Sequence, residues 1–102
     1  MTADRGEIIL SQETLIPGGI MYLVVSGHGY NADQPDRRLV VEVVGPQFPA
    51  AGAYLYDLGT VGAAVLAAPT TLPADWLEGE PIATVDEATM ADIADRLARH
   101  FR

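Results

Sequence analysis

The chain has 102 residues, of which 49% are apolar and 20% charged, a composition that favours one compact folded domain over a disordered chain. The absence of cysteine excludes disulfides and thiolate metal sites. The 14 acidic residues outnumber the 6 basic ones, all arginine, and the net charge of −8 argues against nucleic-acid binding unless the arginines converge on one groove. The longest apolar tract, residues 61–69, is far short of the roughly 20 residues that span a bilayer, so we expect a cytoplasmic protein that does not enter the membrane.

Short runs of apolar and β-branched residues predict five or six strands, at residues 6–11, 20–26, 37–44, 53–57, 61–67 and 81–85. The second run is apolar on both faces, as in a central strand, whereas the third alternates and should have one face partly in water. Residues 27–36 contain Gly, Asp, Asn and Pro and predict a loop. Residues 72–77 predict one helical turn, anchored by Trp76 and Leu77 and ending at Gly79.

The C-terminal segment predicts the one long helix, from Asp86 or Glu87 to Phe101. Its apolar residues share one stripe, at Met90, Ile93, Ala94, Leu97 and Phe101. Thr84 and Glu87 could form a capping box, with Asp86 as the alternative N-cap, and His100 near the far end opposes the helix dipole. The predicted class is α+β, with one domain over residues 1–102. We expect a small, strongly bent antiparallel sheet or SH3-like partial barrel with a C-terminal amphipathic helix packed across it.

Several motifs follow one another in an order that resembles the MazF/PemK toxins of bacterial toxin–antitoxin systems. Near its start the chain has Arg5-Gly6-Glu7-Ile8, which is similar to the opening motif of that family, and the Leu23-Val24-Val25-Ser26 strand is followed by the pair Tyr30-Asn31. A Val-rich strand and a terminal helix after an acidic turn complete the order. The resemblance implies a MazF/PemK-like domain over 1–102 that acts as a homodimeric toxin, cleaves single-stranded RNA without a metal or other cofactor, and is held inactive by a cognate antitoxin.

Two positions depart from that family. Ile20 and Met21 stand where the toxins open the second strand with Arg-Pro, and Gly45-Pro46-Gln47 follows the third strand in place of a Thr or Ser pair. The residues from Pro35 to Val41 also resemble the Pro-Gly-Arg-Arg strand of the related CcdB gyrase poisons. A non-catalytic or gyrase-binding protein of the same fold, acting through protein–protein binding, is therefore the alternative hypothesis.

Metal-free RNA cleavage needs a proton acceptor at the 2′-OH and a cation at the phosphate. His28 is the acid–base candidate, since imidazole exchanges protons near neutral pH, and Gly27 beside it would let a phosphate approach the backbone. Arg37 and Arg38 are the phosphate candidates. The alternatives are a solvated histidine and a surface charge pair balancing nearby aspartates.

The candidate substrate contacts are Ser26 and Asn31, which could hydrogen-bond a base or ribose, and Tyr54 and Tyr56, which could stack on bases. Ser26 and Asn31 could instead end a strand and hold an Asx turn. The two tyrosines could instead belong to the core or to a dimer surface. No acidic or histidine spacing indicates a metal site.

Overall fold

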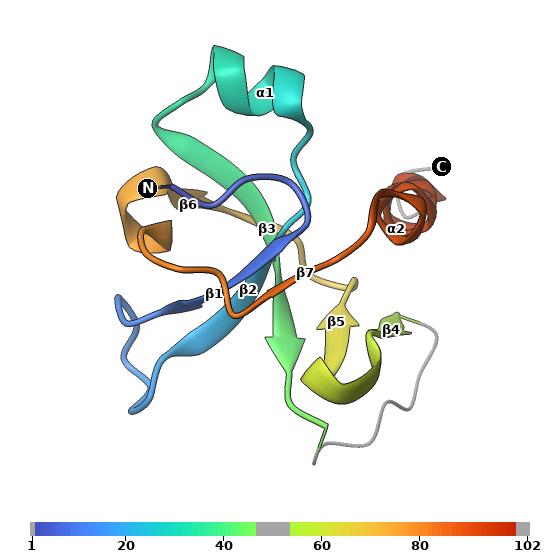
Figure 1. Cartoon of the computed structure of the whole chain (residues 1–102), viewed down its shortest axis with the longest axis horizontal. Helices are drawn as coiled ribbons and strands as arrows, with labels where there is room; N and C mark the ends of the chain where they lie inside the picture. The colour runs from blue at the N-terminus through green and yellow to red at the C-terminus, as the bar shows by residue number, and fades with distance from the viewer. Residues whose placement is uncertain (1, 47–53, 100–102) are drawn as a thin grey trace.

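The computed structural model describes residues 2–46 and 54–99, which form one curled antiparallel sheet and a C-terminal helix (Figure 1). Its strands follow the order β4-β5-β3-β2-β1-β7, and β6 pairs with β3 beside that path. The strands are β1 (Glu7–Ser11), β2 (Ile20–Val24), β3 (Arg37–Val44), β4 (Leu55–Asp57), β5 (Ala63–Val65), β6 (Thr70–Pro73) and β7 (Ala83–Thr84). The helices are α1 (His28–Asp33) and α2 (Glu87–Arg99), with 3₁₀ turns η1 (Gly59–Val61) and η2 (Ala74–Leu77). The predicted α+β class and bent sheet are confirmed.

The centre of the sheet is the antiparallel trio β1, β2 and β3. Leu23 of β2 stands opposite Ile8 of β1 and Val41 of β3, and all three side chains are fully buried. Strands buried on both faces favour unbroken β-branched and aliphatic sequence, which is what β2 carries. β2 is therefore the central strand that the sequence predicted.

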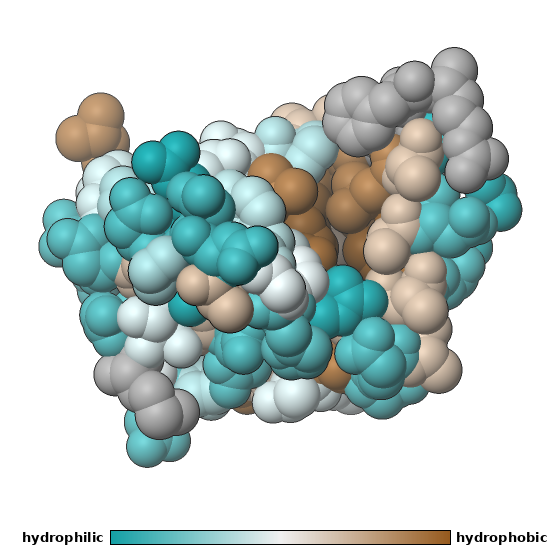
Figure 2. All heavy atoms as spheres, turned by 90° about the horizontal axis from the view of Figure 1, so that it is seen from above, coloured by the Kyte–Doolittle hydropathy of each residue, from teal (hydrophilic) through white to brown (hydrophobic). Residues whose placement is uncertain are grey.

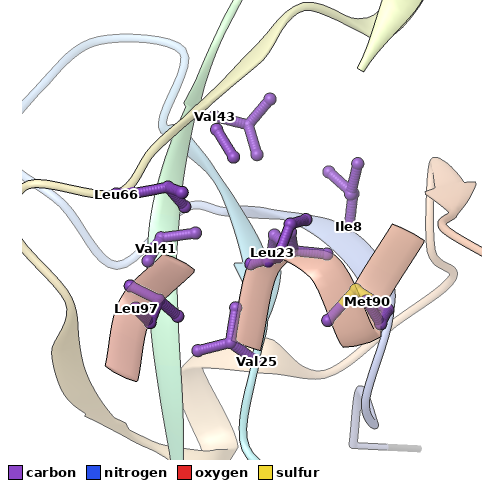
Figure 3. Packing of buried hydrophobic residues seen from close by; sticks show 10 residues of the cluster. Ile8, Leu23, Val25, Val41, Val43, Leu66, Met90 and Leu97 are labelled. Carbon is purple, nitrogen blue, oxygen red and sulfur yellow. The ribbon is translucent and has the colours of Figure 1, made fainter. Parts of the chain in front are cut away.

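Apolar side chains pack on both faces of this trio. One face carries the larger cluster, under α2, and Figure 3 shows Met90 and Leu97 of the helix against the strand residues. The other face is covered by the N-terminal segment and η2, through Ala3 and Leu77. The expectation of a partly wet face on β3 is wrong for Arg38 and Val40, which are buried there, and holds for Glu42, which is exposed.

Helix α2 begins behind Asp86, whose carboxylate accepts hydrogen bonds from the backbone N–H and the hydroxyl of Thr89. These bonds lower the pKa of the Asp86 carboxyl and identify it as the N-cap. Met90, Ile93 and Leu97 form the buried stripe, whereas Ala94 is exposed. The predicted contributions of His100 and Phe101 lie outside the described residues.

The predicted order of elements needs correction in several places. Residues 27–36 are not all loop, because they contain α1. Strand β6 was missed, since a four-residue run that ends in proline gives little strand signal and can serve only at an edge. The run 61–67 forms a shorter strand, preceded by η1, and Ala53 of the run 53–57 lies outside the described residues. In the described residues, no helix has the length and apolar content needed to cross a membrane.

Candidate functional site

The site lies at the end of the sheet that carries α1, where the N-terminal segment meets the end of β2 (Figure 1). Gly6 makes this meeting possible: its backbone N–H donates to the carbonyl of Val24, at 2.9 Å. Its φ of +85° suits glycine, and a Cβ at this position would lie 2.8 Å from the carbonyl oxygen of Val85. The backbone at Gly6 therefore directs Asp4 and Arg5 to the start of α1.

A buried hydrogen-bond network holds α1 in place. The Ser26 hydroxyl donates to Asn31 Oδ1 at 2.6 Å and accepts from the backbone N–H of Leu39 at 3.2 Å. The Asn31 amide donates to Asp4 Oδ1 and to the carbonyl of Ser26. Ser26 and Asn31 are both buried, and each of their side-chain polar groups has a partner. Such a closed network fixes geometry, because an unpaired buried polar group would be costly.

His28 sits at the exposed edge of this network. Its Nδ1 lies 3.3 Å from Asp4 Oδ2, and 69% of its side chain is accessible to solvent. Partial burial raises the pKa of the Asp4 carboxyl, but hydrogen bonds from the Arg5 backbone, Asn31 and His28 outweigh it and hold that pKa below its ordinary value. Asp4 is therefore an ionised acceptor at neutral pH, and the imidazole stands between it and solvent.

Arg5 joins the site to α2. Its guanidinium donates to the Glu87 carboxylate, with Nη2 3.0 Å from Oε1, and Nη1 donates to the carbonyl of Val25 at 3.3 Å. The Arg5 side chain is only 13% exposed. Sequence reasoning used Arg5 only for the opening motif and Glu87 only for the helix cap, and it did not consider Asp4. The motif around Gly6 was the available signal, but nothing local pairs Asp4 with a residue 27 positions later.

The two candidate phosphate ligands differ in their surroundings. Arg38 is buried, and its guanidinium donates to the carbonyls of Ala3 at 2.9 Å and Arg37 at 2.8 Å. Arg37 is half exposed, pairs with Asp36 at 3.4 Å and lines a shallow pocket of about 310 Å³ together with Leu72. A phosphate could approach Arg37 by displacing one exposed carboxylate, whereas at Arg38 it would compete with backbone contacts that hold the N-terminal segment. The roles of both arginines stay predictions.

Gly27 precedes α1 and accepts the backbone hydrogen bond of Asn31 through its carbonyl. A Cβ added at Gly27 or at Gly29 would meet no atom within 4 Å, so the backbone here is open to a ligand. Figure 2 looks onto this end of the molecule and shows hydrophilic residues beside a hollow with apolar atoms in its floor. The predicted approach of a phosphate to this backbone is untested.

The two tyrosines do not join this cluster. Tyr56 lies in β4, which is well separated from α1 in Figure 1, and its hydroxyl donates to Asp92 of α2 at 2.7 Å. Arg96 covers the Tyr56 ring, 4.8 Å from its centroid. The hydrogen bond to Asp92, with burial, raises the pKa of the Tyr56 hydroxyl. Tyr54 is exposed next to β4. Base stacking by either ring stays a prediction.

The arrangement can exchange a proton at His28 and place a cation at Arg37. Among the residues that the structure describes, no three His, Asp or Glu side chains are grouped to hold a metal ion. The carboxylate-paired imidazole and the exposed guanidinium thus lie at the same end of the β2–β3 pair, each in its own polar contact.

No protein-family profile matches the sequence, and no curated protein matches it significantly. Solved structures do match. An endoribonuclease in complex with its cognate antitoxin, from a mycobacterial species, is 26% identical with a TM-score of 0.68, covering 97% of this chain and 94% of that one. A mycobacterial endoribonuclease is 20% identical with a TM-score of 0.77, over 99% and 92%. MazF in a MazE–MazF complex from Deinococcus radiodurans is 16% identical with a TM-score of 0.76, over 99% and 96%. The MazF-like fold that the sequence resemblance implied is confirmed.

Proposed function

We propose that this chain is the toxin of a toxin–antitoxin pair and that it cleaves single-stranded RNA without a metal ion. The observation that carries this proposal is the match along 97% of the chain, at 26% identity, to an endoribonuclease held by its cognate antitoxin. The site supports it independently, because it offers a proton acceptor and a cation at one end of the sheet. Nothing in the structure or in the comparisons favours the alternative, a non-catalytic or gyrase-binding protein of the same fold.

The chemistry would be a transesterification. His28 Nε2 accepts the proton of a ribose 2′-OH, and the 2′-oxygen attacks the adjacent phosphorus. The bond from phosphorus to the 5′-oxygen breaks, leaving a 2′,3′-cyclic phosphate and a 5′-hydroxyl end that takes its proton from solvent. General acid–base assistance of this kind contributes roughly 10²–10⁴-fold to a rate.

Arg37 would supply the positive charge that the phosphorane needs. It lies at the start of β3, with half of its side chain open to solvent. This is the opposite end of the β2–β3 pair from Ile20, where the arginine of the toxins is missing. Ser26 and Asn31 would act mainly by holding α1, since their polar atoms already bond one another and the backbone. The departures from the toxin pattern at Ile20 and Gly45 therefore require that the catalytic site lies at the α1 end of the β2–β3 pair in this chain.

The test is incubation of the purified chain with a long mixed-sequence RNA in EDTA, with product ends read by primer extension. We expect discrete cuts that disappear in His28→Ala and weaken strongly in Arg37→Ala. Asp95→Asn is a matched control, because it removes an exposed α2 charge paired only with Arg99 among the described residues. Intact RNA from a folded sample would contradict the proposal.

The same likeness leads us to expect a homodimer in the cytoplasm, neutralised by a cognate antitoxin. The net charge of −8 further suggests that part of the antitoxin's contact surface is basic. Light scattering after gel filtration reports the mass of the assembly. Co-expression with the candidate antitoxin should restore growth and bring the two chains down together.

A further inference from the structure

We propose that Asp4 is the positioning residue of this site, which holds the proton of His28 on Nδ1 and so leaves Nε2 free to accept a proton. Because that proton transfer belongs to the reaction proposed above, the inference rests on the proposed function and adds the residue that prepares its base.

The Asp4 carboxylate is fixed by three different groups. Oδ1 accepts from the backbone N–H of Arg5 at 2.8 Å and from the amide of Asn31, and Oδ2 faces His28 Nδ1 at 3.3 Å. Both amide groups can only donate, so their contacts keep the carboxylate in one orientation. An ionised carboxylate can only accept, so the imidazole nitrogen that faces it must carry the proton.

The backbone around Asp4 is held as firmly as its side chain. Its own N–H donates to Glu7 Oε1 at 2.6 Å. On one side, Ala3 is held by Leu77 and by the Arg38 guanidinium, and on the other, Gly6 is held by Val24. The carboxylate is therefore in place before any substrate arrives, which is the condition for effective positioning.

A carboxylate in this place acts on the reaction in two ways. It selects the imidazole tautomer that has its lone pair on Nε2, directed away from Asp4, and it stabilises the imidazolium that forms when Nε2 takes the proton. In the described residues, Nε2 has no protein partner, so the substrate hydroxyl would be its first. Asp4 touches no substrate in this scheme and works only through His28.

The decisive variant is Asp4→Asn. Asparagine keeps an oxygen for Arg5 and Asn31 but presents an NH₂ group to His28, which forces Nδ1 to accept and moves the imidazole proton to Nε2. We expect the RNA cleavage rate kcat to fall by roughly 10²–10⁴-fold with KM little changed, as when a base is held in the wrong tautomer. A residue that merely stabilised α1 would not change the tautomer.

The tautomer is read from long-range ¹H–¹⁵N correlations of the neutral imidazole at pH 8.5, in the wild type and in Asp4→Asn. His28→Gln assigns the His28 signals, since the chain has only one other histidine. Asp95→Asn, which removes an equal charge from α2, should leave both tautomer and cleavage unchanged.

Each outcome of these measurements either supports or overturns the proposed role of Asp4. A wild-type His28 with its proton mainly on Nε2 overturns the proposal, and this result needs no variant to fold. A folded Asp4→Asn variant that keeps the wild-type tautomer also overturns the proposal. The same holds if Asp4→Asn cleaves RNA at a rate within about threefold of wild type while His28→Ala is inactive. If the wild type cuts no RNA, the proposed function fails, and the tautomer shift then decides separately whether Asp4 holds His28.

Discussion

Helices α1 and α2 are held to the same sheet by different forces. Helix α2 buries Met90, Ile93 and Leu97 in the larger apolar cluster, whereas the one residue that α1 buries is the polar Asn31. Apolar burial contributes free energy in proportion to the area removed from water and has little directional preference. Hydrogen bonds contribute about 1 kcal/mol each but fix distances and angles.

This difference assigns separate tasks to the two regions. Helix α2 supplies stability to the whole sheet, and α1 supplies a defined position for His28 at modest local stability. Segments with few buried apolar contacts open more readily than the core they are attached to. Substitutions in α2 should therefore unfold the protein as a whole, whereas those in the α1 network should act mainly on the site.

The largest effect is expected from Ile93→Ala, which removes a fully buried side chain from under α2. Truncations of this kind cost about 2–5 kcal/mol, a large part of the stability of a domain of this size. Urea unfolding followed by circular dichroism measures the loss. Ala91→Ser, on the exposed side of the same helix, should change stability by less than about 0.5 kcal/mol. A loss below 1 kcal/mol for Ile93→Ala would contradict this account of α2.

A smaller and more local effect is expected from Asn31→Ala. It removes one hydrogen-bond partner from the Ser26 hydroxyl and one from the Asp4 carboxylate, at a cost of about 1–3 kcal/mol. Hydrogen exchange should accelerate at the amides of Asn31 and Gln34 while the amides of β2 and β3 keep their protection. Asp33→Ala, at an exposed position of the same helix, serves as the control. Equal acceleration throughout the sheet would mean that α1 is not a separate local unit.

The elements that are held by apolar packing, β3 and α2, could be predicted from the sequence. The bounds of β3 were predicted to the residue, and α2 was located because its apolar spacing repeats along the helix. Periodic patterns report burial against a neighbouring layer whatever that neighbour is. The pattern wrongly predicted that Ala94 is buried, because the apolar stripe of α2 is wider than the surface that contacts the sheet. It also wrongly predicted a partly wet face on β3, because the N-terminal segment that covers this face has no periodic pattern.

The polar network around α1 could be predicted from the sequence only in part. Ser26, His28 and Asn31 were singled out together because they are close in sequence, and the structure brings them together. Asp4 was missed because its contacts with His28 and Asn31 span 24 and 27 positions and depend on the turn at Gly6. The residues 27–36 were predicted as a loop for the same reason: Gly and Asn disfavour a helix locally, and the network stabilises one nonetheless.

A modest gain in stability is expected from Gly29→Ala. The residue lies inside α1 with open space at the Cβ position, so alanine should raise stability by about 0.4–1 kcal/mol by restricting the unfolded chain. Thermal unfolding gives the stability, and RNA cleavage is measured in parallel. Gly6→Ala is the opposite control, because its backbone conformation and the Val85 carbonyl both exclude a side chain. If cleavage falls in a stabilised Gly29→Ala, a substrate group approaches this backbone.

The smallest effect is expected from acid titration of Asp4, whose side chain is half exposed and therefore screened by solvent. Its pKa is lower in the folded protein than the ordinary value of 3.8. A depressed carboxyl pKa adds stability above pH 3.8, and this part is lost as the pH falls through the lower folded value.

Asp36, Glu78 and Asp86 also have lowered pKa values. The contribution of Asp4 is therefore isolated only by the difference in stability between wild type and Asp4→Asn. The stability of wild type minus that of Asp4→Asn, measured by urea unfolding, should shrink as the pH falls below about 4. The Asn31 side-chain amide signal should shift over the same pH range in the wild type only. A difference that does not change between pH 5 and pH 3 would show that Asp4 carries no charge-dependent contact in the network, and α1 would then be held by Ser26 and Asn31 alone.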